Sequence, residues 1–143
     1  MNKTIKELAV ELTIEITAVC DTIKGRAVFV NQLLRSCSSI GANSYEAKYA
    51  QSTADFVNKL EIALKECYET DYWLEILFKV GSMEESTYKT LANKCGAISQ
   101  KAHRLHHHRK GKRIEAKVHS LASVIARFTS WHGIAYQKRW LTI

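Results

Sequence analysis

The segment from residue 56 to residue 77 places small and apolar side chains at alternating spacings of four and three residues. This spacing keeps one face of an α-helix against a partner helix, because seven residues complete almost two helical turns. A chain with such a seam must provide other helices to cover it. The seam positions are Phe56, Leu60, Ala63, Cys67, Thr70, Leu74 and Leu77.

Three further segments carry apolar residues at helical spacing, within residues 5–19, 30–40 and 88–105. Gly25 and Gly81 separate neighbouring segments, so the connections between the helices are short. The chain has no proline, which destabilises a helix interior by about 3 kcal/mol. Short connections make consecutive helices antiparallel neighbours. The sequence therefore predicts an all-α protein, an antiparallel up-and-down four-helix bundle with a short basic C-terminal helical extension.

Short polar motifs predict where the helices begin. Thr4 with Glu7, and Ser82 with Glu85, have the spacing of a capping box, in which a hydroxyl and a carboxylate satisfy free amide donors. Ser52 precedes the seam and offers a further N-terminal cap.

Charge is distributed unevenly along the chain. Residues 101–143 contain ten of the 21 lysines and arginines and all six histidines, but only one acidic residue, Glu115. We predict a four-helix bundle over residues 1–108 and a basic amphipathic extension over residues 109–143, with a linker around Gly111. The asymmetry favours an anionic partner, nucleic acid first. A solvated tail that only keeps the protein in solution explains the same pattern equally well.

The densest basic cluster is the candidate nucleic-acid interface. Phosphate neutralisation depends on charge density more than on a fixed geometry, so such a cluster favours RNA or DNA binding without sequence specificity. The candidate residues are Lys101, Arg104, Arg109, Lys110, Lys112 and Arg113.

The middle of the chain carries a recognisable pattern. It reads QLLRSCSSIGANSYEA over residues 32–47, Asp-Phe at 55–56, LEIALKE over residues 60–66 and ETDYWL over residues 69–74. The pattern resembles the bacterial four-helix bundle protein family, and the resemblance extends over about residues 5–107. Some members of that family are encoded in intervening sequences of 23S ribosomal RNA genes, and others are accessory variability determinants of diversity-generating retroelements.

The resemblance implies an antiparallel four-helix protomer that assembles into a homo-oligomer, most often a ring-like homopentamer. In the retroelement branch it implies a basic surface that contacts nucleic acid and a reverse transcriptase. The expected function is that of a non-catalytic oligomeric nucleic-acid-binding accessory protein. The alternative is a structural homo-oligomeric scaffold that recruits a protein partner and has no nucleic-acid role.

Four polar residues of the family pattern fall on one stripe of the second helix. A guanidinium and a carboxylate on one face can pair across a helix or a subunit boundary. We interpret these residues as structural, because polar groups in a helical interface specify packing and register. They are Arg35, Ser39, Asn43 and Glu46.

Enzyme chemistry is not expected. A di-metal carboxylate site requires Glu-x-x-His motifs, and the first 100 residues contain no histidine. The four cysteines are far apart and read as small buried hydrophobic residues. We therefore expect no catalytic residue, no metal and no cofactor. No apolar run approaches the roughly 18 residues of a membrane span, so we expect a cytoplasmic protein without a membrane partner.

Overall fold

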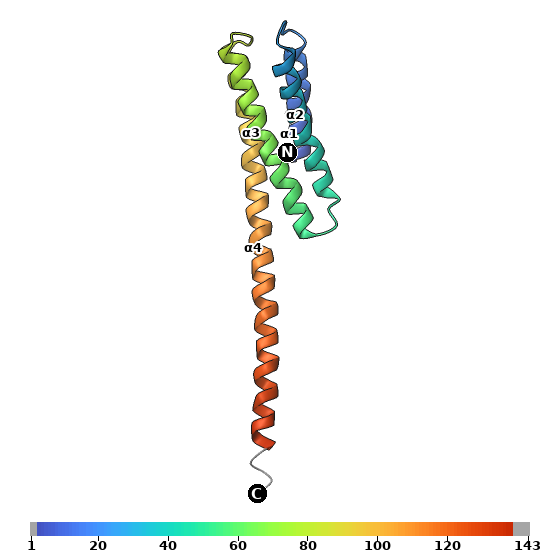
Figure 1. The fold of residues 1–143 in the computed structure, drawn as a ribbon, viewed down its shortest axis with the longest axis vertical. Coiled ribbons are helices and arrows are strands. Elements are labelled where there is room, and N and C mark those ends of the chain that lie inside the picture. The colour runs from blue at the N-terminus through green and yellow to red at the C-terminus, as the bar shows by residue number, and fades with distance from the viewer. Residues whose placement is uncertain (1–2, 139–143) are drawn as a thin grey trace. The chain divides into compact units, whose positions relative to one another are not determined.

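The computed structural model describes the backbone of residues 3–138, and the side chains of that range except those of residues 109, 110, 113 and 124–138. This part of the chain contains four helices, and the chain divides into two compact units, Met1–His107 and His108–Ile143 (Figure 1). The helices are α1 (Ile5–Cys20), α2 (Ala27–Lys48), α3 (Thr53–Lys79) and α4 (Glu85–Lys138).

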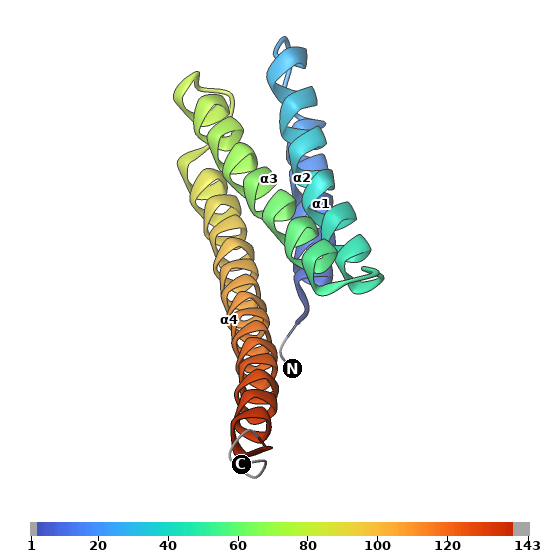
Figure 2. The same cartoon turned by 60° about the horizontal axis from the view of Figure 1, so that its bottom comes forward.

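The first unit is an antiparallel up-and-down four-helix bundle, which confirms the predicted fold class. α2 packs against α1 on one side and against α3 on the other (Figure 2). The Sγ atom of Cys95 in α4 donates to the backbone oxygen of Cys67 in α3, at 3.2 Å. Lys94 of α4 forms an ion pair with Glu15 of α1. These contacts close the ring of four helices.

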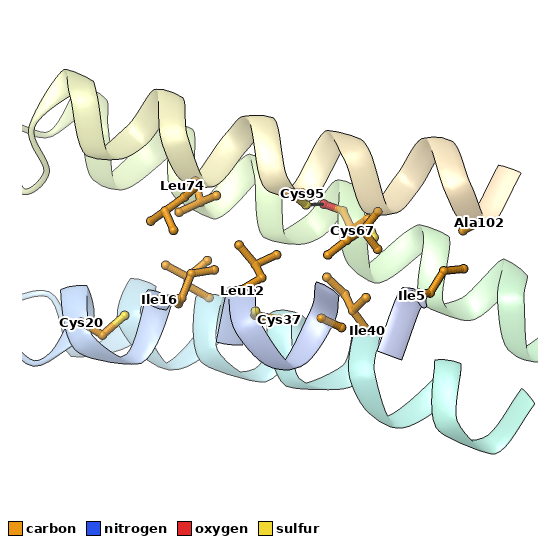
Figure 3. Packing of buried hydrophobic residues seen from close by; sticks show 14 of the residues in the cluster. Ile5, Leu12, Ile16, Cys20, Cys37, Ile40, Cys67, Leu74, Cys95 and Ala102 are labelled. Carbon is orange, nitrogen blue, oxygen red and sulfur yellow. Dashed lines mark hydrogen bonds between the residues drawn. The ribbon is translucent and has the colours of Figure 1, made fainter. Parts of the chain in front are cut away.

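The predicted seam forms the α3 side of the core. Six of its seven residues are buried, and Phe56 is half-buried against the core. Figure 3 shows Cys67 and Leu74 directed toward side chains of α1 and α2, among them Leu12 and Ile40. The heptad spacing therefore identified the buried face of α3, because helix geometry alone places those positions on one side.

Two of the predicted helix starts are confirmed. The side chain of Thr4 accepts from Glu7 N at 3.2 Å while the Glu7 carboxylate accepts from Thr4 N at 2.7 Å, which completes the capping box of α1. The side chain of Ser52 accepts from Asp55 N at 3.1 Å at the start of α3.

The capping box predicted at Ser82 is wrong, because α4 begins at Glu85. Ser82 instead helps to terminate α3. Its backbone N–H donates to Leu77 O at 2.9 Å, and that of Gly81 donates to Phe78 O at 2.9 Å. Gly81 has a φ of 72°, so the three features together form a Schellman motif.

The predicted linker around Gly111 is also wrong, because α4 continues through Gly111 to Lys138 without a break. The amphipathic stretch after Gly111 is part of α4 and not a fifth helix. The neighbouring arginines, lysines, glutamate and alanine are good helix formers, and one interior glycine costs only about 1 kcal/mol. Among the described helices, none combines the length and apolar character needed to cross a membrane.

The two glycines predict substitutions of opposite sign. Gly111→Ala is expected to raise helix content and to stabilise its segment by about 0.5–1 kcal/mol, because alanine loses less entropy in a helix. Gly81→Ala is expected to destabilise the bundle by about 1–2 kcal/mol, because its φ is unfavourable for a residue with a Cβ. A Cβ at either position meets no atom within 4 Å, so crowding does not contribute. Thermal unfolding followed by circular dichroism measures both effects; loss of helix in Gly111→Ala would contradict the continuous α4.

Candidate nucleic-acid interface

The antiparallel topology brings the start of α1, the end of α2, the start of α3 and the middle of α4 to one end of the bundle. Two hollows lie there. The four-helix hollow has a volume of about 530 Å³ and is lined by residues of all four helices. The α1–α4 hollow has a volume of about 590 Å³ and is lined by residues around α1 and α4. Lys101 and Leu105 line both, so the two hollows adjoin.

The lining of these hollows is strongly cationic. Among the described residues, five basic side chains contribute to it and Glu7 supplies the one carboxylate. Outside the lining, Glu11 pairs with Lys3 at 2.7 Å. The hydrogen bond between the Glu7 carboxylate and the Thr4 backbone lowers the pKa of Glu7, so this carboxylate is ionised at neutral pH and committed to the α1 cap. We call this surface the basic end; its cations are Lys3, Lys6, Lys48, Lys101 and Arg104.

Two exposed tyrosines lie beside the basic end, Tyr45 in the last turn of α2 and Tyr49 at its C-cap. The Nζ atom of Lys6 is 4.7 Å from the ring centroid of Tyr45, and that of Lys48 is 5.6 Å from the ring centroid of Tyr49. The two rings meet edge to face, with centroids 5.2 Å apart. Tyr45 is 44% exposed and Tyr49 is 62% exposed. The surface thus combines cations with aromatic rings that reach solvent.

The structure distributes the six predicted basic residues between the two units. Lys101 and Arg104 belong to the basic end, where Lys101 Nζ donates to the backbone oxygen of Lys3 and Arg104 is exposed. Lys112 is exposed on the second unit. The side chains of Arg109, Lys110 and Arg113 lie outside those that the structure describes.

Sequence reasoning missed three cations of the basic end, Lys3, Lys6 and Lys48. They are isolated in the sequence and do not form a run. A signal was nevertheless present, because an up-and-down bundle places the start of its first helix and the end of its second helix at the same end. Combining the predicted topology with the position of each lysine would have identified them.

Two of the polar family-pattern residues of α2, Arg35 and Glu46, form ion pairs with α3. Arg35 forms ion pairs with Glu69 and, at 3.6 Å, with Glu66. The hydrogen bond from Arg35 lowers the pKa of Glu69, whereas burial raises the pKa of Glu66. Near the end of α2 and the start of α3, Glu46 pairs with Lys59.

Asn43 and Ser39 interact within α2. The Nδ2 atom of Asn43 donates to the backbone oxygen of Ser39 at 2.9 Å, and both residues are half-buried. Arg35 and Glu46 thus link α2 to α3 through ion pairs, whereas the hydrogen bond of Asn43 stays within α2.

The four cysteines and two of the described histidines, His103 and His106, are engaged in contacts within the bundle, whereas His107, His108 and His119 are exposed. All four cysteines are buried and free, and burial raises the pKa of Cys20 and of Cys37 to about 11. His106 is buried, with Nε2 2.7 Å from Glu61 Oε1, and His103 Nε2 lies 3.0 Å from the Tyr68 hydroxyl. Where side chains are described, no three His, Cys, Asp or Glu residues gather as metal ligands.

The fold and the site define a class of protein: a small all-α bundle with ion-paired central helices and a cationic, partly aromatic end. The model of the 23S rRNA-intervening sequence protein family matches residues 1–104. The chain belongs to this family.

One solved structure supports the same assignment. The crystal structure of a protein of unknown function from the S23 ribosomal protein family of Bacteroides thetaiotaomicron is 37% identical, with a TM-score of 0.68. The similarity covers 72% of this chain and 98% of that one. No curated protein matches the chain.

Proposed function

We propose that this protein is a non-catalytic RNA-binding protein and that the basic end of its bundle contacts the phosphate backbone. One observation carries the proposal: among the described residues, five cations and one carboxylate, that of Glu7, line the two adjoining hollows, and Glu11 pairs with Lys3 at 2.7 Å, which leaves an excess of positive charge. A surface with this imbalance attracts a polyanion and repels most acidic side chains.

The mode of binding follows from the residue types. Lysine and arginine neutralise phosphates and release condensed counterions, which gives affinity without reading the base sequence. The second unit carries further predicted phosphate-binding cations of its own, Arg109, Lys110, Lys112 and Arg113. DNA carries the same backbone charge, so we propose that it competes with RNA for this surface.

Assembly would strengthen these contacts. A homo-oligomer, and a pentamer in particular, presents several basic ends to one nucleic acid, and linked weak contacts gain affinity through effective concentration. The homopentamer and the reverse-transcriptase partner implied by the family resemblance stay predictions.

A second candidate function, that of a scaffold which recruits a protein partner, is favoured by a different observation. Val10 and Ile14 are exposed on α1, and Val28 is exposed at the start of α2. Val10 and Ile14 lie four residues apart and therefore share one face of α1, and a contiguous exposed apolar patch is typical of a protein contact. These side chains offer nothing to a phosphate, so this function and RNA binding would use different surfaces.

Salt dependence tests the RNA-binding proposal. Fluorescence anisotropy of a labelled single-stranded RNA is measured with the full chain over a salt series. Each phosphate contact contributes about −0.7 to the slope of log affinity against log salt, so we expect a slope of about −2 to −4. Failure to bind near physiological salt would contradict the proposal and leave the scaffold function.

A further inference from the structure

The four-helix hollow differs from a simple cationic surface because its floor is apolar. Ile5, Ala47, Leu60 and Leu105 contribute to its lining, and Phe56 adds an aromatic ring. Its volume of about 530 Å³ falls within the range of about 300–1,000 Å³ that is common for small-ligand sites. Phosphate alone does not need such a floor, whereas a nucleobase has two apolar faces that do.

The rim of the hollow supplies the complementary charge. Lys6, Lys48 and Lys101 line it, and among the described residues neither Lys6 nor Lys48 forms an ion pair with a carboxylate. Instead, these two lysines lie against the Tyr45 and Tyr49 rings. Each exposed ring therefore has an ammonium group beside it. If a base stacks on the ring, this ammonium group can neutralise the phosphate of the same nucleotide.

We propose that the four-helix hollow holds an unpaired base of a single-stranded RNA and that the Tyr45–Tyr49 pair stacks a neighbouring base. The inference rests on the proposed function and names its substrate class. Aromatic side chains stack on any base and tolerate sequence variation, which agrees with the absence of a base-reading motif in the sequence. In a duplex the bases are paired and stacked inside the helix, so they do not reach a concave site without being extruded.

Filling the hollow without changing its charge tests the proposal. Ser44 is half-buried and lines the hollow, so Ser44→Trp places an indole in it. Ser38→Trp is the matched control, because Ser38 is exposed on α2 and does not line the hollow. Affinities for an oligo-uridine strand and for an RNA duplex of equal length are measured with the full chain by anisotropy at one salt concentration.

We expect the unmodified chain to bind the single strand more tightly than the duplex. Ser44→Trp is expected to weaken single-strand binding about 5- to 100-fold, the effect of losing one stacked base, and to leave duplex binding unchanged. Ser38→Trp is expected to change neither affinity. Circular dichroism of both variants checks that the bundle is intact.

A surface variant decides the question if Ser44→Trp fails to fold. Tyr45→Leu combined with Tyr49→Leu is expected to remove the preference for the single strand, whereas Tyr72→Leu, at an exposed tyrosine of α3, retains it. Equal binding of single strand and duplex, insensitive to the filling and tyrosine variants, would overturn the inference and leave the proposed function standing. Binding of neither nucleic acid would overturn both.

Discussion

Replacing Lys6, Lys48, Lys101 and Arg104 by glutamine is expected to weaken binding of single-stranded RNA about 100-fold or more. Near 0.1 M salt, a contact that contributes about −0.7 to the salt slope is worth about fivefold in affinity, and four such contacts multiply. The slope itself is expected to become shallower by about 2 to 3. Anisotropy titrations over a salt series measure both quantities.

A matched variant separates the position of the charges from their number. Lys24, Arg26, Lys79 and Lys89 are exposed at the opposite end of the bundle, near the α1–α2 and α3–α4 connections. Replacing these four by glutamine removes the same net charge. Lys79 and Lys89 lose only exposed i,i+4 ion pairs, which contribute little to stability because solvent screens them, so the bundle is retained. Equal loss of affinity in the two variants would contradict a binding site at the basic end.

Leu12→Ala is expected to lower the free energy of unfolding by about 2–5 kcal/mol. The Leu12 side chain is 0% exposed and lies in the core between α1 and the facing helices (Figure 3). Truncation removes buried apolar surface and leaves a cavity that the surrounding close-packed side chains fill only in part. Urea unfolding followed by circular dichroism measures the change.

Ile14 provides the control on the same helix. Its side chain is 65% exposed, so Ile14→Ala is expected to change the free energy of unfolding by less than about 0.5 kcal/mol. A loss at Ile14 as large as that at Leu12 would show that the α1 surface is covered in solution. Such a result would indicate that the chain associates with itself through α1, since no other protein is present in the measurement.

The bundle could be predicted from the sequence because its core depends on spacing. Cys67, Leu74 and Leu77 are buried where the seam places them, and Thr4 and Ser52 cap α1 and α3 as their motifs predict. These signals are local: helical geometry and hydrogen bonds within one turn determine them.

The errors occurred where one local signal competed with another. Ser82 has the spacing of a capping box, but its backbone N–H is used to close α3 at the Gly81 turn. Gly111 has a low helix propensity, but strong helix formers surround it, and α4 continues. The spacing of residues does not tell which of two competing local preferences determines the backbone conformation, whereas the structure shows it directly.

The candidate site could be predicted only in part. Lys101 and Arg104 were found because they belong to a dense basic cluster in the sequence. Lys6 and Lys48 lie beside these residues only because of the bundle topology. The Tyr45–Tyr49 pair becomes a candidate for base stacking only because those two lysines lie against its rings. The glutamates that face Arg35 likewise emerge only when α2 and α3 are packed together.

Ultraviolet crosslinking of a bound single-stranded RNA to the full chain, with mass spectrometry of the crosslinked peptides, tests the central claim most directly. The basic end predicts crosslinks to residues 3–6, 45–49 and 101–105, which come from separate helices and meet at one end of the bundle. Crosslinks confined to the opposite end, around residues 24–26 and 79–89, would contradict it.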